Sequence, residues 1–74
     1  MNFDSKVLGQ RLKTLLAACD MSQAELAEKC DTTTATINAY ANGSMVPGID
    51  KVCRLAEALQ TTPNVLCGWS ELTL

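Results

Sequence analysis

The segment Ser22–Gly43, SQAELAEKCDTTTATINAYANG, contains two short helices and the turn that joins them. Its first four residues form a capping box, in which the Ser22 hydroxyl accepts a hydrogen bond from the Glu25 amide while the Glu25 carboxylate reaches back to the serine amide. A helix is therefore predicted to begin at this serine. It should end at Asp31, because aspartate tolerates a left-handed backbone better than a branched residue does.

The second half of this segment predicts another helix, capped by Thr33 and running over residues 34–42. Gly43 provides the stop, since glycine adopts the left-handed conformation that ends a helix. Ile37, together with Tyr40 or Ala41, should form its buried face. Two short capped helices joined by a tight turn are a helix-turn-helix pattern.

Three further helices are expected around this pair. Leucines at helical spacing predict a helix over residues 5–19 with Asp4 or Ser5 as its cap, and Pro47-Gly48 breaks the chain before a helix that starts at Ile49. Thr62-Pro63 predicts a short fifth helix. No stretch predicts a strand, so the fold class is all-α, with one domain over residues 1–74. The side chains expected inside are Leu8, Leu12, Leu15, Leu16, Cys19, Leu26, Ala27, Cys30, Ile49, Val52, Cys53, Ala56 and Leu59, and the fifth helix carries Val65 and Leu66.

Composition excludes several classes of protein. The chain has 74 residues, 47% of them hydrophobic and 19% charged, which is typical of a small globular domain and not of a disordered segment. Its longest apolar run, residues 15–19, is far shorter than the roughly 20 residues that cross a bilayer. We therefore expect no membrane partner, and a chain this short leaves little surface for a small-molecule pocket.

The four cysteines, at 19, 30, 53 and 67, form no CxxC pair, and the chain has no histidine. We therefore predict no metal site, no cofactor and no catalytic activity, because neither zinc spacings nor a base beside a nucleophile is present. Cysteines that replace apolar residues at helical spacing are typical of buried thiols, with disulfides as the alternative. Buried thiols favour a reducing, cytoplasmic location.

The charge pattern is unusual in the middle of the chain. The net charge is −2, yet residues 32–49 contain no ionisable side chain except Tyr40. Whatever partner this segment contacts, it does not attract that partner by charge. The whole cationic supply is Lys6, Arg11, Lys13, Lys29, Lys51 and Arg54.

Residues 22–43, with Pro47, residues 55–59 (LAEAL) and residues 66–68 (LCG), resemble the Cro/C1-type helix-turn-helix DNA-binding domains, also called the lambda-repressor-like or XRE family. The similarity covers about residues 7–68. It implies a bacterial or phage-encoded regulator, of the repressor kind, that binds double-stranded DNA by sequence. The alternative is a protein-interaction module of the antitoxin or antirepressor type with little affinity for DNA.

The resemblance also implies which residues face DNA. The second helix of the pair enters the major groove, and Asn38 is the best candidate for base discrimination, because asparagine makes paired hydrogen bonds with adenine. Gln23 matches a position that contacts phosphate, with plain solvated surface as its alternative. Asn42 matches another phosphate contact, with helix termination as its alternative. The DNA-binding set is Lys6, Gln23, Thr33, Thr34, Ala35, Asn38, Ala39, Asn42 and Ser44.

The chain departs from this family in lacking arginine and lysine on that helix and in the loop after it, so we expect a weak grip on the DNA backbone. A homodimer is expected, since one helix recognises only a few base pairs. The expected interface is the apolar C-terminal segment, which holds Val65, Leu66, Trp69, Leu72 and Leu74. In the alternative, Trp69 covers the core of its own chain.

Overall fold

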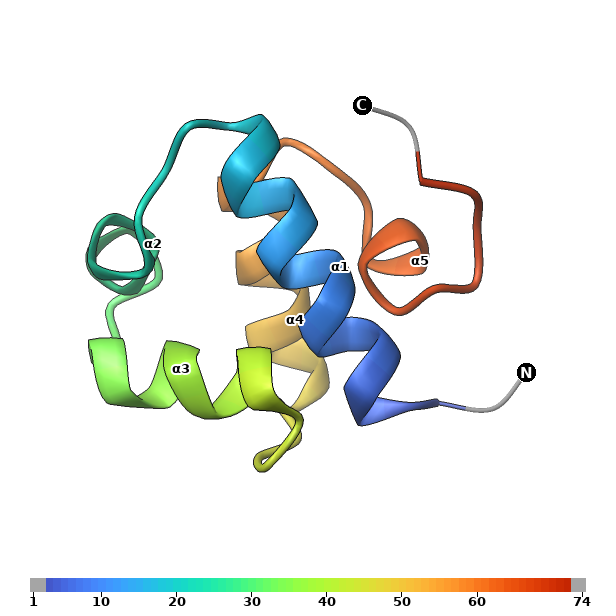
Figure 1. The fold of residues 1–74 in the computed structure, drawn as a ribbon, viewed down its shortest axis with the longest axis horizontal. Helices are drawn as coiled ribbons and strands as arrows, with labels where there is room; N and C mark the ends of the chain where they lie inside the picture. The colour runs from blue at the N-terminus through green and yellow to red at the C-terminus, as the bar shows by residue number, and fades with distance from the viewer. Residues whose placement is uncertain (1–2, 73–74) are drawn as a thin grey trace.

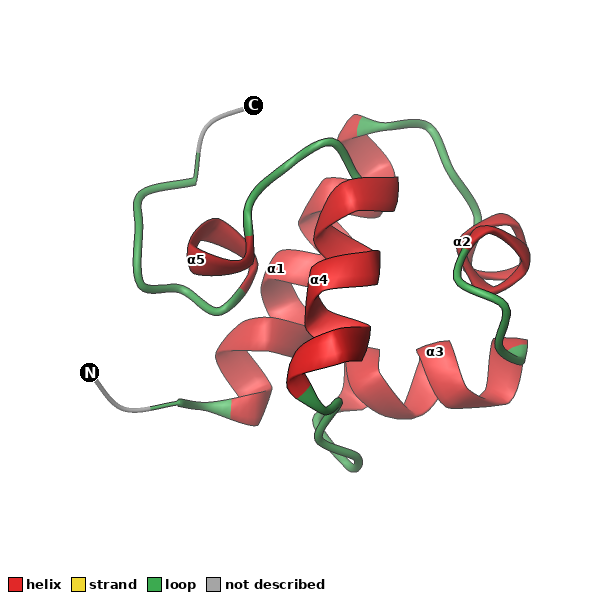
Figure 2. Cartoon of the chain, turned by 180° about the vertical axis from the view of Figure 1, so that it is seen from behind, coloured by secondary structure: helices red, strands yellow, loops and turns green. Residues whose placement is uncertain are grey.

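The computed structural model describes residues 3–72, and within that range the chain forms five helices and no strand (Figures 1 and 2). The all-α prediction is therefore confirmed. Leu74 lies outside the described residues. The helices are α1 (Ser5–Ala18), α2 (Gln23–Lys29), α3 (Thr34–Asn42), α4 (Ile49–Ala58) and α5 (Pro63–Leu66).

The helix starts follow the caps that the sequence contains. Asp4 caps α1 by accepting from the Lys6 amide, and Ser22 and Glu25 form both bonds of the capping box at the start of α2. Thr33 and Thr62 cap α3 and α5 through their hydroxyls. These four starts were predicted correctly because a cap is a contact between residues only two or three positions apart.

All five helices end in the same way. Each is followed by a residue in the left-handed conformation, and the next amide donates to the carbonyl five positions earlier at 2.8–3.0 Å, which is the Schellman pattern. Only two of these five residues are glycines. The left-handed residues are Asp20, Asp31, Gly43, Gln60 and Gly68.

All five helices contribute to the core, in which α1 packs on α3 and α5. Figures 1 and 2 show α1 and α4 overlapping at the centre, with α2 and α3 on one side and α5 on the other. Helix α2 packs on α3 and α4, and α4 packs on α5. The largest fully buried side chains come from all five helices or their ends: Leu8, Leu12, Leu26, Cys30, Ile37, Leu55, Leu59 and Leu66.

Helix α4 is rotated relative to the prediction. Val52, Ala56 and Leu59 are buried as expected, but Ile49 is 72% exposed and Cys53 is also exposed, so both were wrongly placed in the core. Leu55 takes the fourth buried position. The apolar spacing along this helix is compatible with two stripes one residue apart, and packing against α2 and α5 selects the second.

Helices α1 and α3 approach each other closely at Gly9. This glycine is buried, and a Cβ atom built at this position would overlap the backbone carbonyl oxygen of Ala41 and lie 3.0 Å from that of Tyr40. The first turn of α1 also meets the end of α3, where the Ser5 hydroxyl donates to the Gly43 carbonyl at 3.3 Å. These contacts fix how α3 is presented on the surface.

Candidate nucleic-acid interface

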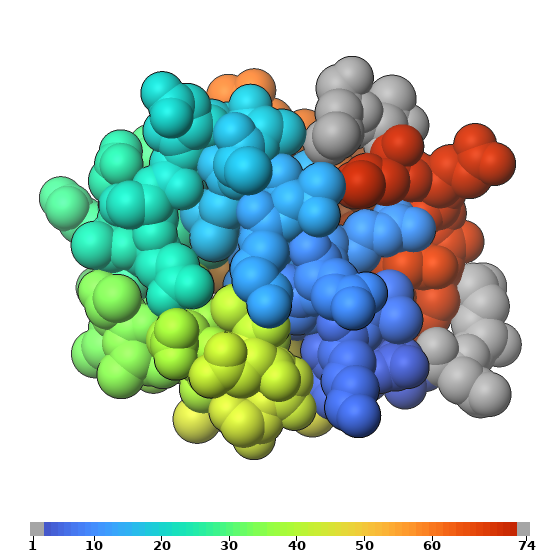
Figure 3. All heavy atoms as spheres, viewed as in Figure 1, coloured from blue at the N-terminus to red at the C-terminus, as the bar shows by residue number. Residues whose placement is uncertain are grey.

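Helices α2 and α3 are held in a fixed relation by side chains beneath them. Leu26 and Ile37 are fully buried, and the small Ala27 is buried where the two helices pack. Close packing of this kind leaves little freedom to rotate one helix against the other. The outer side of α3 is therefore presented at a defined angle, beside the start of α2 (Figure 3).

The predicted contact residues on this side are open to solvent. Thr33, Thr34, Ala35, Asn38, Asn42, Ser44 and Lys6 are exposed, whereas Gln23 and Ala39 are half-buried. Between Thr34 and Asn38, other described residues cover only two positions, which face inward: Thr36 is half-buried and Ile37 is buried. The set thus lies on a surface that a partner can reach.

Three carboxamides on this surface form one hydrogen-bonded chain. The Asn38 Nδ2 group donates to Gln23 Oε1 at 3.3 Å, and the Asn42 Nδ2 group donates to Asn38 Oδ1 at 3.1 Å. These two hydrogen bonds link α2 to two successive turns of α3. We call these three residues the amide ladder. They are uncharged and offer both donors and acceptors to a partner.

The hydroxyl groups of the set are partly occupied. Thr33 Oγ1 accepts from the Thr36 amide at 3.2 Å and lies 2.9 Å from Thr36 Oγ1. Ser44 Oγ donates to the Ala39 carbonyl at 3.2 Å. Both residues therefore secure an end of α3. Thr34 has no such role in the hydrogen bonds of the described residues, and its hydroxyl is the one most available to a partner.

Two of the six basic side chains, Lys6 and Arg11, lie in different parts of the structure. Lys6 lies against the end of α3, since a Cβ atom at Gly43 would be 3.5 Å from its Cα and Cγ atoms. Arg11 instead turns toward the C-terminal part of the chain, where its Nη1 group donates to the carbonyls of Val65 and Ser70 at 2.9 and 3.0 Å. Arg11 is therefore a structural residue that ties α1 to α5.

The predicted dimer segment is only partly exposed. Leu66 is fully buried in the core of its own chain, which removes it from a surface where the prediction placed it, because α5 packs onto α1 and α4 with this side chain inward. Val65 and Leu72 are half-buried, and Trp69 is 39% exposed. The large apolar side chains that are exposed elsewhere in residues 3–72 are Phe3, Met45, Val46 and Ile49.

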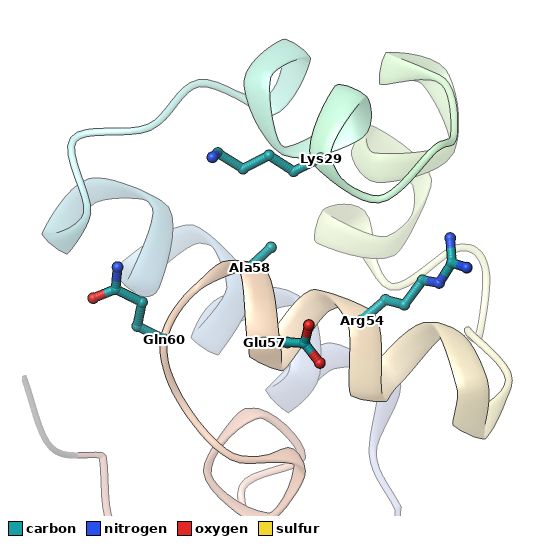
Figure 4. Close-up of a pocket in the computed structure, with 5 residues that line it drawn as sticks. All are labelled: Lys29, Arg54, Glu57, Ala58 and Gln60. Carbon is teal, nitrogen blue, oxygen red and sulfur yellow. The ribbon is translucent and has the colours of Figure 1, made fainter.

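An open hollow of about 530 Å³ lies at the other end of α2, away from Gln23. Figure 4 shows that α4 and Gln60, two residues beyond its end, supply most of its lining, with Lys29 reaching in from α2. Its charged side chains are of both signs, which favours no single class of small ligand. The lining residues are Lys29, Arg54, Glu57, Ala58 and Gln60.

The cysteines are free thiols in different surroundings. Cys30 and Cys67 are buried, Cys19 is half-buried and Cys53 is exposed, so the prediction of buried thiols is correct for two of the four. Burial raises the pKa of the Cys30 thiol, and nearby Arg54 and Lys51 oppose that rise. Burial also raises the pKa of Cys67, with a smaller contribution from Cys53. Both buried thiols therefore stay protonated at neutral pH.

No group of three or more potential metal ligands occurs within residues 3–72. In the same range, no helix is long and apolar enough to cross a bilayer.

Two residues that hold the helices together were not singled out from the sequence. Gly9 was missed because its role depends on a contact with α3, about thirty positions away, and a glycine inside a helix carries no local sign of it. Arg11 was counted only as a charge, although it stands three residues after Leu8 and four before Leu15, a spacing that places it beside the apolar side of the helix.

A family comparison matches residues 12–66 to the model of the helix-turn-helix family. That range includes α2, α3, α4 and α5 completely. The comparison with curated protein sequences finds no match to this chain.

Solved structures with similar folds include regulators. The restriction-modification controller protein C.AhdI from Aeromonas hydrophila is 28% identical over 85% of this chain and 96% of its own, with a TM-score of 0.81. The P22 c2 repressor protein, solved with the synthetic operator 9T, is 20% identical over 86% and 97%, with the same TM-score. The second likeness shows the fold alone.

The same fold also occurs inside a larger protein. HppE, solved with iron(II) and its substrate, is 26% identical over 85% of this chain but only 37% of its own length, with a TM-score of 0.79. The described helices of this chain therefore correspond to about a third of that protein.

Proposed function

This chain belongs to the helix-turn-helix family, and we propose that it binds double-stranded DNA by sequence and thereby regulates transcription in a bacterium or phage. The observation that carries the proposal is the exposed, uncharged outer side of α3, held rigidly by Ile37 and Ala27 beneath it. The likeness to a controller protein over nearly its whole length supports the regulatory role. No catalytic role is proposed for this surface.

In the proposed complex, α3 lies in the major groove. Asn38 is the residue we assign to direct recognition, because a free carboxamide edge pairs with the N7 and N6 groups of adenine. The Thr34 hydroxyl bonds to a neighbouring base, and the methyl group of Ala35 packs on a thymine methyl. Recognition would then rest on hydrogen bonds and methyl contacts, without a charged side chain.

The backbone contacts in this proposal are few. Gln23 at the start of α2 and Lys6 beside the end of α3 are the candidates for phosphate, one through its amide and the free N–H groups of the helix start, the other through its charge. Arg11 is excluded because it is bound to the carbonyls of Val65 and Ser70. We therefore propose moderate affinity.

A homodimer completes the proposal. One recognition helix covers only a few base pairs. A second copy would place another α3 in the major groove about 34 Å away, one helical turn further along the duplex. Val65, Trp69 and Leu72 are the exposed or half-buried apolar residues that we assign to the interface. The protein would act in the cytoplasm, where the DNA of a bacterium or an infecting phage lies.

Selection of binding sites from random duplexes at a stated salt concentration tests the proposal. We expect one short sequence, repeated about one helical turn apart, to be enriched. Enrichment of no sequence would contradict the proposal.

The second candidate function is the protein-interaction module. It is favoured by the exposed apolar side chains after α3, of which Val46 is 60% and Ile49 is 72% exposed. Retention on immobilised duplex DNA separates the two candidates. A DNA-binding protein elutes earlier as salt rises, whereas a protein-only module is not retained at any salt concentration.

A further inference from the structure

Two side chains of α1, one turn apart, hold the C-terminal part of the chain. The Arg11 Nη1 group donates to the Val65 carbonyl at 2.9 Å and to the Ser70 carbonyl at 3.0 Å. Val7 packs against the turn between these carbonyls, because a Cβ atom built at Gly68 would overlap the Val7 Cγ1 atom. The segment between the two carbonyls is therefore attached to α1 at both ends and in the middle.

A guanidinium is well suited to this attachment. It offers only donors and is always charged, so its hydrogen bonds to carbonyl groups are stronger than those between neutral groups. The Val65 carbonyl lies in the last turn of α5, where basic side chains commonly bind the carbonyls at a helix end. The Ser70 carbonyl lies beyond that helix. Arg11 thus bridges the end of α5 and the chain that follows it.

Trp69 lies between these attachment points. Its amide donates to the Asn64 carbonyl at 2.8 Å, which fixes its backbone against the last turn of α5, and the residue is 39% exposed. It is the one tryptophan of the chain. A tryptophan side chain is large, rigid and mostly apolar, and such side chains contribute much of the binding energy at protein interfaces. The attachments to α1 therefore determine where this side chain is presented.

The rigidity of the segment affects association with a second copy. A segment that becomes ordered only when two subunits meet loses conformational entropy at that step, whereas a segment already held in its bound shape does not. Without the Arg11 bonds, Leu66 and Cys67 would still anchor the segment by their burial in the core. The chain after them would be freer, while α2 and α3 would keep their packing.

We propose that Arg11 is the positioning residue of the subunit interface, which holds the carbonyls of Val65 and Ser70 and thereby presents Trp69 to a second copy of this chain. This inference rests on the homodimer of the proposed function. In the hydrogen bonds of residues 3–72, Arg11 is bound to neither α2 nor α3. Dimerisation and recognition of a single half-site should therefore respond separately to its loss.

Three variants test the proposal. Arg11→Met removes both hydrogen bonds but keeps a long, flexible side chain. Lys13→Met is the matched control, since it removes the same charge from an exposed site of the same helix. Val7→Ala weakens only the contact with Gly68, and this milder change decides the question if Arg11→Met does not fold. Circular dichroism and thermal melting verify which variants are folded.

Dimerisation is measured without DNA by sedimentation equilibrium, and DNA binding by anisotropy with duplexes that contain one or two half-sites. Arg11→Met should weaken dimerisation by about tenfold or more, and Val7→Ala by a smaller factor. Lys13→Met should dimerise like wild type. The affinity of Arg11→Met and Val7→Ala for the duplex with one half-site should stay at the wild-type value, which a general loss of structure would not allow.

The outcomes separate the inference from the proposed function. Dimerisation of all folded variants at the wild-type level would overturn the inference, as would an equal loss of affinity for both duplexes in Arg11→Met. A wild-type protein that stays monomeric would overturn the proposed dimer, and the inference with it. A wild-type protein that dimerises but selects no sequence would overturn the proposed recognition of DNA and leave the inference standing.

Discussion

Gly9 in α1 lies directly against the backbone of Ala41 in α3, so closely that a Cβ atom at position 9 would overlap the Ala41 carbonyl oxygen. Replacement of glycine by alanine inside a helix normally stabilises it by about 1 kcal/mol. Here the contact is with backbone, which cannot move aside as a flexible side chain does. The presentation of α3 therefore depends on the absence of a side chain in α1.

Gly9→Ala should accordingly lower the free energy of unfolding, by about 1–3 kcal/mol, the usual effect of overpacking. Urea denaturation followed by circular dichroism measures the change. Ala17→Gly, at an exposed site of the same helix, serves as the control and should cost about 1 kcal/mol through helix propensity alone. A more stable Gly9→Ala protein would show that α1 and α3 do not approach this closely.

Gln60, the left-handed residue after α4, is a site where a substitution should raise the free energy of unfolding. Gln60 has a φ of 57°, a conformation that costs a non-glycine residue roughly 1–2 kcal/mol. Gln60→Gly removes this cost but gives the unfolded chain more freedom, and a net stabilisation of about 0.5–1 kcal/mol is expected. Glu57→Gly, one turn earlier in α4, should instead destabilise by about 1 kcal/mol. If both changes destabilise equally, the helix does not end at this residue as described.

The ends of the helices illustrate what the sequence predicts well. The caps at Ser22, Thr33 and Thr62 and the stop at Gly43 depend on neighbours a few residues away, and all four were predicted correctly. The left-handed Gln60 was not predicted, because glutamine has no particular preference for that conformation and the packing of α4 and α5 imposes it.

The surface features were less predictable because they depend on how helices are placed relative to one another. The spacing of Asn38 and Asn42 puts them on one side of α3, but the bond from Asn38 to Gln23 exists only because α2 crosses at a given angle. Ile49 and Cys53 were wrongly assigned to the core because spacing alone did not decide between two neighbouring stripes of α4.

The buried thiols predict how stability depends on pH. Burial raises the pKa of Cys30 and Cys67 above the ordinary value of 9.0. The folded protein therefore holds these protons more tightly than the unfolded chain, and the contribution of the two thiols to stability should be constant below about pH 8 and fall as pH rises through 9 and beyond. Urea midpoints measured at pH 7.5 and 9.5 test this. The double variant Cys30→Ala/Cys67→Ala should be less stable at both values, with a smaller difference between them. An equal difference in both proteins would assign the pH dependence to other groups.

The salt dependence of DNA binding should be modest. If Lys6 and one further lysine of each subunit contact phosphate, a dimer neutralises about four charges, and the slope of log K against log salt is about −4. Lys6→Ala should reduce the slope by about two, one charge from each subunit. Lys29→Ala is the matched control, since Lys29 lines the hollow at the far end of α2. Equal loss of slope in the two variants would remove Lys6 from the proposed contact.

The account depends most on the claim that an uncharged surface of α3 distinguishes base sequences. Competition titration by fluorescence anisotropy, with the selected duplex labelled and unlabelled duplexes as competitors at 0.15 M salt, tests it directly. We predict that the selected duplex binds at least about 10³-fold more tightly than a scrambled one. Asn38→Ala should cost about 1–3 kcal/mol and relax the preference at one position of each half-site, whereas Asn64→Ala on α5 should change neither. Equal binding of the selected and scrambled duplexes by the wild-type protein would contradict the account.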